Sequence, residues 1–172
     1  MRKVILGLAI SLDSFIEGPN GEYDWCFTDQ DYGLNEFFKR VDTVFIGRKS
    51  YEMSFGAEDG AGFEFPKMKE YVFSNTLKQV KEGVTVVSGD IKAEVEKIKK
   101  EDGKDIWLFG GGSLTTSLMS LGLVDEFWLS VHPIILGEGK PLFHGLKDRT
   151  YLKLVETKVY ETGLVSLKYI LA

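Results

Sequence analysis

Three consecutive glycines followed by a helical pattern form the part of the sequence whose chemical use is clearest. Gly110, Gly111 and Gly112 follow the apolar run 106–109 and precede a Ser/Thr-rich segment whose leucines recur at helical spacing. Glycine lacks a Cβ atom, so the backbone can take positive φ and another group can approach closely. The first N–H groups of a helix lack partners within the helix and favour anions. The pattern indicates either a phosphate-binding turn or a tight turn that binds nothing.

A second junction of the same kind carries two cations. Gly47 follows the apolar run 43–46 and is itself followed by Arg48, Lys49 and Ser50. The two cations are either ordinary surface charges or phosphate ligands. Two strand–glycine–helix junctions, one of them cationic, suit a ligand with more than one phosphate group.

The elements that would position these junctions alternate along the chain. Helical spacing is found over 31–40 and 91–100 and from the glycines to 121, and strands are expected at 4–10, 43–46, 70–73, 84–87 and 106–109. Because a helix or long crossover separates each strand from the next, we expect a mostly parallel sheet with helices on both faces. Ligands of such sheets bind beyond the carboxyl ends of the strands, where both glycine junctions fall.

The C-terminal part has a different rhythm. A strand is expected over 126–135, where Pro133 marks a bulge or a sheet edge, and a hairpin joins strands over 151–160 and 164–171. The glycine-rich segment 55–65 is expected to be a mobile loop. The aromatic residues of 22–27 either seal the edge of the core or line the pocket of a planar ligand. With no repeat or linker, residues 1–172 are expected to form one domain.

Composition excludes several classes of function. The formal charge of −5 argues against a general affinity for nucleic acid or for anionic membranes. Cys26 is the only cysteine, so no intrachain disulfide can form, and the cytoplasm is the expected compartment. With two histidines besides, no metal site is expected. No apolar run approaches the ~18 residues of a membrane span, so no membrane association is expected.

Five motifs that occur in a fixed order carry a resemblance to a known family. Over nearly its whole length the chain resembles the dihydrofolate reductase-like superfamily, and most closely the reductase domain of bacterial riboflavin biosynthesis. The motifs are Ala9-x-Ser11-Leu12-Asp13-x-x-Ile16-x-Gly18, Gly47-Arg48-Lys49-Ser50-Tyr51-Glu52, Gly110-Gly111-Gly112-Ser113-Leu114, Leu123-Val124-Asp125-Glu126 and Pro133-Ile134-Ile135-Leu136-Gly137-Glu138-Gly139-Lys140-Pro141-Leu142-Phe143.

The resemblance implies an NADPH-dependent reductase that transfers hydride to a small heterocyclic substrate, as 5-amino-6-(5-phosphoribosylamino)uracil reductase does. It implies an α/β fold with a mixed, mostly parallel sheet, helices on its flanks and an antiparallel C-terminal hairpin. By the same resemblance, the nicotinamide carboxamide would meet Ala9 and Ile16, and the phosphates would be held by Gly47, Arg48, Lys49, Ser50, Gly110, Gly111, Gly112, Ser113, Leu114 and Thr115. Ser74 and Asn75 would make a second contact with the adenosine 2′-phosphate.

One position departs from dihydrofolate reductase itself. That enzyme has a carboxylate on the helix after the first loop, where this chain has Leu34, and Asp31 and Glu36 are out of register. Asp13 is therefore the candidate for a polar group at the reacting end, and its alternative role is to cap the loop after the first strand. The segment 19–25 also departs from the riboflavin enzyme, so the resemblance leaves the substrate open.

Other readings remain at this point. The chain could be a pterin reductase of the dihydrofolate reductase type or a nucleotide-binding protein without catalysis, and the glycine turns could be purely structural. The resemblance also implies a cis peptide bond between Gly110 and Gly111, and a homodimer. The apolar segment 127–136 supports the dimer independently if it is an edge strand, because an apolar edge needs a cover.

Overall fold

The strands of the molecule lie in one large sheet and one small ribbon. A computed structural model describes residues 1–55 and 65–172, so most of the expected glycine-rich loop lies outside the described residues. Across the eight-stranded sheet the order is β5 (Val84–Val87), β4 (Lys69–Phe73), β3 (Val41–Gly47), β6 (Asp105–Gly110), β1 (Val4–Ser11), β7 (Glu126–His132), β10 (Val165–Leu171) and β9 (Leu152–Val159).

Pairing in the sheet is parallel from β5 through to β7 and antiparallel from β7 to β9. The expected mixed sheet with an antiparallel C-terminal hairpin is confirmed, and β1 lies inside it. The expectation that segment 127–136 is an edge strand is wrong. β7 pairs with β1 on one side and β10 on the other and ends before Pro133, so β9 is the strand at this edge.

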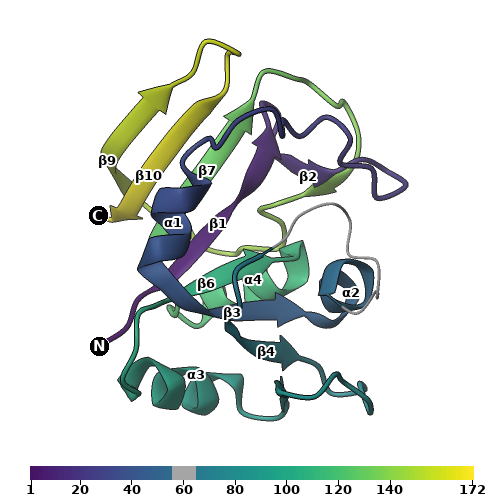
Figure 1. Cartoon of the computed structure of the whole chain (residues 1–172), viewed down its shortest axis with the longest axis vertical. Helices are drawn as coiled ribbons and strands as arrows, with labels where there is room; N and C mark the ends of the chain where they lie inside the picture. The colour runs from purple at the N-terminus through teal and green to yellow at the C-terminus, as the bar shows by residue number, and fades with distance from the viewer. Residues whose placement is uncertain (56–64) are drawn as a thin grey trace.

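Helices cover both faces of the sheet (Figure 1). Helix α1 (Leu34–Arg40) packs Phe37 against Ile5, Trp107 and Trp128. Helices α3 (Ile91–Lys100) and α4 (Gly112–Ser120) pack on the opposite face, where their buried side chains join Leu6 and Phe45. Alternate residues of β1 therefore serve two cores, as expected for a strand covered on both faces.

Several boundaries differ from the sequence-based prediction. Helix α1 begins at Leu34 and not at Asp31, because Tyr32 (φ 48°) and Gly33 (φ 87°) turn the chain just before it. The short helix α2 (Arg48–Ser50) continues as the π-helix η1 (Tyr51–Phe55). A ribbon of β2 (Phe15–Glu17) and β8 (Lys140–Pro141) joins two segments that were expected to be loops.

Gly7 allows α1 to approach the middle of β1. A Cβ atom at Gly7 would lie 2.8 Å from Cζ of Phe37 and 3.2 Å from Nε1 of Trp107. The indole N–H of Trp107 donates to the Gly7 carbonyl at 2.7 Å. The same face of β1 continues with Ala9, beyond the ring of Phe37.

We expect Gly7→Ala to lower the free energy of unfolding by about 1–3 kcal/mol, because the added methyl group overpacks a buried contact between rings. Gly47→Ala is the matched control, since a Cβ atom there would meet neighbours only at 3.7 Å and its φ of −76° suits any residue. Urea unfolding of both variants measures the difference. Equal stability of Gly7→Ala and the wild type would show that Phe37 moves aside without cost.

Candidate cofactor and active site

The two glycine junctions meet at the carboxyl edge of the sheet. Strands β3 and β6 are parallel neighbours, and Ile46 is in register with Gly110. A Cβ atom at Gly47 would lie 3.7 Å from the carbonyl oxygen of Gly110, and one at Gly111 would lie 3.1 Å from Oγ of Ser50. The structure therefore brings together two turns that the sequence separates by some sixty residues.

The turn from β6 into α4 is made by positive φ angles. Gly110 has φ 101° and Gly111 has φ 90°, a region that residues with a Cβ atom rarely adopt. The expected cis peptide bond between them is wrong, because the bond is trans and the two φ angles already reverse the chain.

Gly112 packs closely against a segment distant in sequence, and its expected part in binding phosphate stays a prediction. It is the first residue of α4 and does not have a positive φ. A Cβ atom there would lie 2.7 Å from Nε2 of His144 and 3.0 Å from the carbonyl oxygen of Pro141. Glycine is thus required at this position for close packing of the segment that follows β8. A branched side chain at Gly112 would harm folding directly.

Thr115 carries a polar atom without a partner at the start of α4. The residue is fully buried, and its Oγ1 has no hydrogen-bond partner within the described residues. A Cβ atom at Gly110 would lie 3.6 Å from this oxygen. Buried hydroxyl groups nearly always find a partner, so an unpaired one beside a glycine turn indicates a place for a ligand atom. Leu114 is buried beside it and Ser113 is exposed.

Arg48 links the ends of β3 and β4. Its Nη1 donates to Oγ1 of Thr76 at 3.1 Å, while Ser74 Oγ accepts the backbone N–H groups of Thr76 and Leu77. Asn75 Oδ1 accepts the N–H of Gly89 at 3.3 Å. Ser74 and Asn75 therefore lie in a polar turn that Arg48 reaches, and their expected contact with a 2′-phosphate stays a prediction.

Thr76 is a member of this turn that the sequence analysis missed. Its position after Ser74 and Asn75, in a run of three polar residues at the end of a strand, is the signal that could have identified it. Lys49 is exposed on α2 beside Arg48.

Asp13 holds two loops together. Its Oδ1 accepts from the Ser11 hydroxyl at 2.7 Å and from the N–H of Leu136 at 3.2 Å, and its Oδ2 accepts the N–H of Gly137 at 2.8 Å. The pKa of Asp13 is lowered, chiefly by the Ser11 hydroxyl and also by these N–H groups, against a smaller effect of burial. Asp13 is therefore a carboxylate at neutral pH. These contacts favour its capping role, and a catalytic role stays a prediction.

Of the two residues expected at the reacting end, Ala9 follows Gly7 on the α1 face of β1. Ile16 lies in β2 against the cluster that holds the buried side chains of α3 and α4. Their contact with a nicotinamide stays a prediction. On β6, Phe109 lies with its ring centroid 5.0 Å from that of Trp107 and 5.9 Å from that of Phe65. Aromatic rings thus line the same face of the sheet as Ala9.

His132, at the end of β7, fixes the aromatic loop that precedes α1. Its Nε2 accepts the N–H of Phe27 at 3.1 Å, and Nδ1 lies 3.1 Å from the carbonyl oxygen of Ser130. The rings of Trp25 and Phe27 pack on the imidazole at 5.3 and 5.1 Å. Burial lowers the pKa of His132, so the ring is neutral at pH 7. These aromatic residues seal the edge of the core, one of the two roles expected for them.

The alternation of Trp128, Ser130 and His132 on one face of β7 is the signal that could have identified this histidine.

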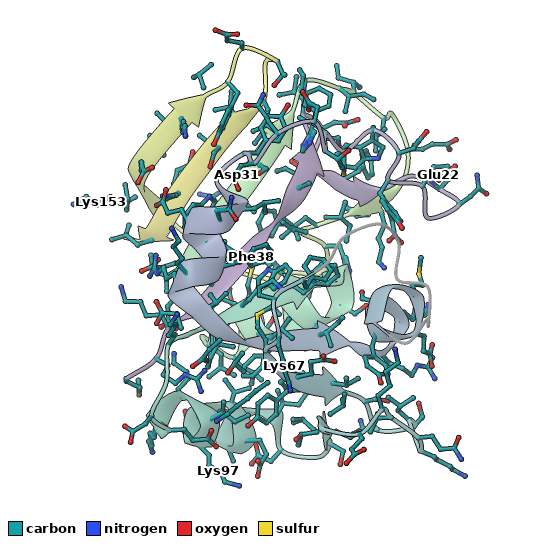
Figure 2. The ribbon with its side chains drawn as sticks, viewed as in Figure 1. Glu22, Asp31, Phe38, Lys67, Lys97 and Lys153 are labelled. Atoms are coloured by element: carbon teal, nitrogen blue, oxygen red, sulfur yellow. The ribbon has the colours of Figure 1, made fainter. Side chains whose placement is uncertain are left out.

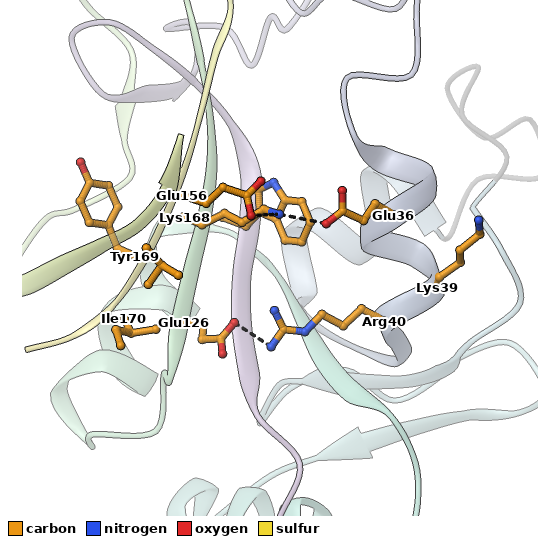
Figure 3. Close-up of a pocket in the computed structure, with 10 residues that line it drawn as sticks. Glu36, Lys39, Arg40, Glu126, Glu156, Lys168, Tyr169 and Ile170 are labelled. Atoms are coloured by element: carbon orange, nitrogen blue, oxygen red, sulfur yellow. Dashed lines mark hydrogen bonds and ion pairs between the residues drawn. The ribbon is translucent and has the colours of Figure 1, made fainter. Parts of the chain in front are cut away.

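A hollow of about 470 Å³ lies elsewhere, between α1 and the strands β7, β9 and β10 (Figure 3). Lys168 Nζ lies 3.0 Å from carboxylate oxygens of both Glu36 and Glu156 and 3.6 Å from the ring centroid of Trp128. Arg40 pairs with Glu126 at 2.7 Å. The glycine junctions lie on β3 and β6, so this hollow is not the site that the sequence predicts, and its charges already neutralise one another.

Residues 1–55 and 65–172 hold no group of three or more side chains able to bind a metal ion. None of the helices in this part of the chain is long and apolar enough to cross a membrane.

Comparison with known proteins decides the family. The model of the RibD C-terminal domain matches residues 2–166. The chain belongs to this family. It is therefore a member of the riboflavin-pathway reductase family, and its sheet has the expected dihydrofolate reductase-like arrangement.

Relatives of this family match over the whole chain. The uncharacterized protein YyaP of Bacillus subtilis is 45% identical, with 98% of this chain and 94% of YyaP covered. A putative riboflavin biosynthesis protein from Shewanella sp. PV-4 superposes with a TM-score of 0.85 at 25% identity, covering 100% and 99% of the two chains.

A longer protein shares the fold alone. The diaminohydroxyphosphoribosylaminopyrimidine deaminase/5-amino-6-(5-phosphoribosylamino)uracil reductase of Thermotoga maritima gives a TM-score of 0.73 at 15% identity. The match covers 99% of this chain and 57% of that one.

We expect Asp13→Asn to lower the free energy of unfolding at neutral pH, because an amide replaces a carboxylate that accepts three hydrogen bonds. The pKa of Asp13 in the folded state lies below its ordinary value of 3.8. Its contribution is therefore complete above pH 3.8 and disappears as the pH falls through the folded-state pKa. Unfolding measured across this range should show the wild type and the variant converging in acid.

Asp102→Asn, in the exposed turn before β6, is the control and should show no such convergence. A stability difference between Asp13→Asn and the wild type that is the same in acid as at neutral pH would contradict the anchoring role of the carboxylate.

Proposed function

We propose that this chain is an NADPH-dependent reductase that transfers hydride to a small heterocyclic substrate. Membership of the riboflavin-pathway reductase family supports reduction as the chemistry. The observation that carries the choice of cofactor is the unpaired, fully buried Thr115 hydroxyl beside the turn of Gly110 and Gly111, with Arg48 on the neighbouring strand end. A dinucleotide with a 2′-phosphate matches this combination of a helix start, a buried hydroxyl and a cation.

The fit assigns each part of the cofactor to residues of the chain. The N–H groups at the start of α4, the Thr115 hydroxyl and Ser50 would hold the pyrophosphate. Arg48, with Ser74 and Thr76, would hold the 2′-phosphate at the end of β4. Ala9 and Ile16 would present backbone groups to the nicotinamide.

Hydride transfer itself requires few catalytic side chains. NADPH supplies the hydride when bound, so the protein must align donor and acceptor and exclude water. Phe109 and Ala9 provide an apolar surface on the α1 face for this purpose. Asp13 is ionised and His132 is neutral with both ring nitrogens engaged, so neither is placed to give up a proton at neutral pH. We infer that the proton comes from water.

A nucleotide-binding protein without catalysis is the second candidate. It is favoured by Leu34, which stands where dihydrofolate reductase has its carboxylate and leaves a pterin without an acid. Oxidation of NADPH, followed by absorbance with aminopyrimidine, pterin and quinone substrates, separates the two candidates. Cofactor binding with no oxidation by any of them would support the non-catalytic protein.

Arg48→Ala tests the cofactor assignment. Charge-assisted hydrogen bonds contribute roughly 1.5–3 kcal/mol, so we expect NADPH affinity to fall about ten- to a hundredfold while NADH affinity changes little. Titration of cofactor fluorescence measures both constants. Lys153→Ala, on the distant strand β9, removes an equal charge and should leave both unchanged. Equal affinity of the wild type for NADPH and NADH would contradict the assignment.

We also propose that the protein is a homodimer in a reducing compartment, the cytoplasm. Burial and the nearby Asp24 carboxylate raise the pKa of the Cys26 thiol to about 11, which keeps it protonated.

The edge strand β9 carries exposed apolar side chains at Val155 (59%) and Val159 (71%), and Tyr151 just before it is 72% exposed. An apolar sheet edge invites pairing, and a two-fold axis would cover it with its own copy.

Val159→Lys is expected to convert the dimer into a monomer, because the ammonium group would be buried in the apolar contact. Val159→Thr keeps the branched shape and should remain dimeric. Sedimentation velocity at micromolar concentration distinguishes the two states. A wild-type mass of 19.4 kDa throughout would contradict the dimer.

A further inference from the structure

The chain from β1 through the middle of α1 carries no positive charge. Residues 4–38 contain no Lys or Arg, and the loop that joins β1 to α1 crosses the carboxyl edge of the sheet beside Ala9. Acidic residues are spread along the loop and the first turn of α1, at Asp13, Glu17, Glu22, Asp24, Asp29, Asp31 and Glu36. In Figure 2, Asp31 lies at the start of α1 and Glu22 lies far along the same loop.

We propose that the substrate of this reductase is a planar heterocycle that carries no phosphate group. The proposal rests on the proposed reductase function and narrows its substrate. The proposed substrate differs from that of the Thermotoga maritima protein, whose name includes a phosphoribosylamino compound. Two independent features carry the proposal, the charge of the loop between β1 and α1 and the chemistry of the side chains on the α1 face of the sheet.

The helix start nearest to this region cannot serve a phosphate. Asp31 accepts the N–H of Gly33, which precedes α1, at 3.1 Å and the N–H of Asn35, in its first turn, at 2.8 Å. The negative charge of Asp31, with Glu36 in the first turn, would repel a second anion there.

Several cations of neighbouring elements are already paired with other groups. Lys140 pairs with Glu17 at 3.2 Å, and Lys168 is held between Glu36 and Glu156. Lys158 Nζ lies over the ring of Tyr160 at 4.8 Å, and Lys39 is among the residues that line the hollow beside Lys168. Lys67 is exposed two residues after Phe65, on the segment leading into β4. Residues 56–64, outside the described part, contain no Lys or Arg in the sequence.

Aromatic rings take the place of charge in this region. Phe38 projects from α1 with its ring centroid 5.6 Å from that of Trp107 and 6.1 Å from that of Phe65, and Phe65 lies 5.9 Å from Phe109. Phe38, Phe65 and Phe109 are only partly buried. Figure 2 shows Phe38 on the side of α1 that faces the middle of the molecule. Partly buried rings on the α1 face of the sheet suit the flat face of a heterocycle.

The test compares 5-amino-6-(5-phosphoribosylamino)uracil with its dephosphorylated form. Calorimetric titration into the full chain, saturated with NADP⁺ so that no turnover occurs, gives both dissociation constants. We expect the dephosphorylated compound to bind at least about tenfold more tightly at low salt, since a phosphate of charge near −2 meets an excess of carboxylates in this loop. The ratio should fall towards one as salt screens the repulsion.

Two charge-reversal variants test whether the carboxylates of the loop cause the discrimination against the phosphorylated compound. Asp24→Lys places a cation in the loop beside Trp25 and should reduce the discrimination about threefold or more, whereas Asp102→Lys, in the turn before β6, should leave it unchanged. Equal or tighter binding of the phosphorylated compound by the wild type would overturn the proposal, as would binding of neither compound or an equal response to both reversals.

Failure of the reductase function gives a different result. Oxidation of NADPH by the dephosphorylated compound is measured separately on the wild type. Tight binding of that compound without oxidation would contradict the proposed reductase and leave the assignment of ligand class standing.

Discussion

The candidate site depends on the parallel alignment of β3 and β6 in adjacent positions of the sheet. Because the two strands run in the same direction and are in register near their ends, the turns that follow them open at the same edge. Gly111 and Ser50 then approach to the distance at which a side chain on the glycine would crowd the hydroxyl. The start of α4 with the buried Thr115 hydroxyl and the start of α2 with Arg48 share this edge only because the sheet places these strands side by side.

A second constraint determines which part of β1 stays open on the α1 face of the sheet. Gly7 lets Phe37 and Trp107 fill the middle of the α1 face, so the surface left open on β1 is Ala9 near the carboxyl edge. The loops around it are tied down by polar contacts, with Asp13 joining the loop after β1 to residues 136–137 and His132 holding the aromatic segment. Arg48 and Lys49 thus lie at the end of β3, and the acidic and aromatic residues of 13–31 lie in the loop between β1 and α1.

Local patterns predicted the elements well, because apolar runs and glycine turns are signals within one segment. The parallel sheet, the meeting of Gly47 with the glycines 110–111, and the hairpin at the C-terminus followed from them. Contacts between segments that are distant in sequence could not be predicted from these local patterns. Nothing near Gly112 in the sequence reveals that Pro141 and His144 pack against it, and the apolar β7 looks like an exposed edge until its pairing with β10 is known. The partnership of His132 with Phe27 was missed for the same reason.

The most direct measurement of the central claim is a crystal structure of the protein soaked with NADPH. The account predicts density for the pyrophosphate at the N–H groups that start α4, with an oxygen within hydrogen-bonding distance of Thr115 Oγ1, and density for the 2′-phosphate against Arg48. Cofactor density in the hollow beside Lys168, or elsewhere with the Thr115 hydroxyl still unpaired, would contradict it.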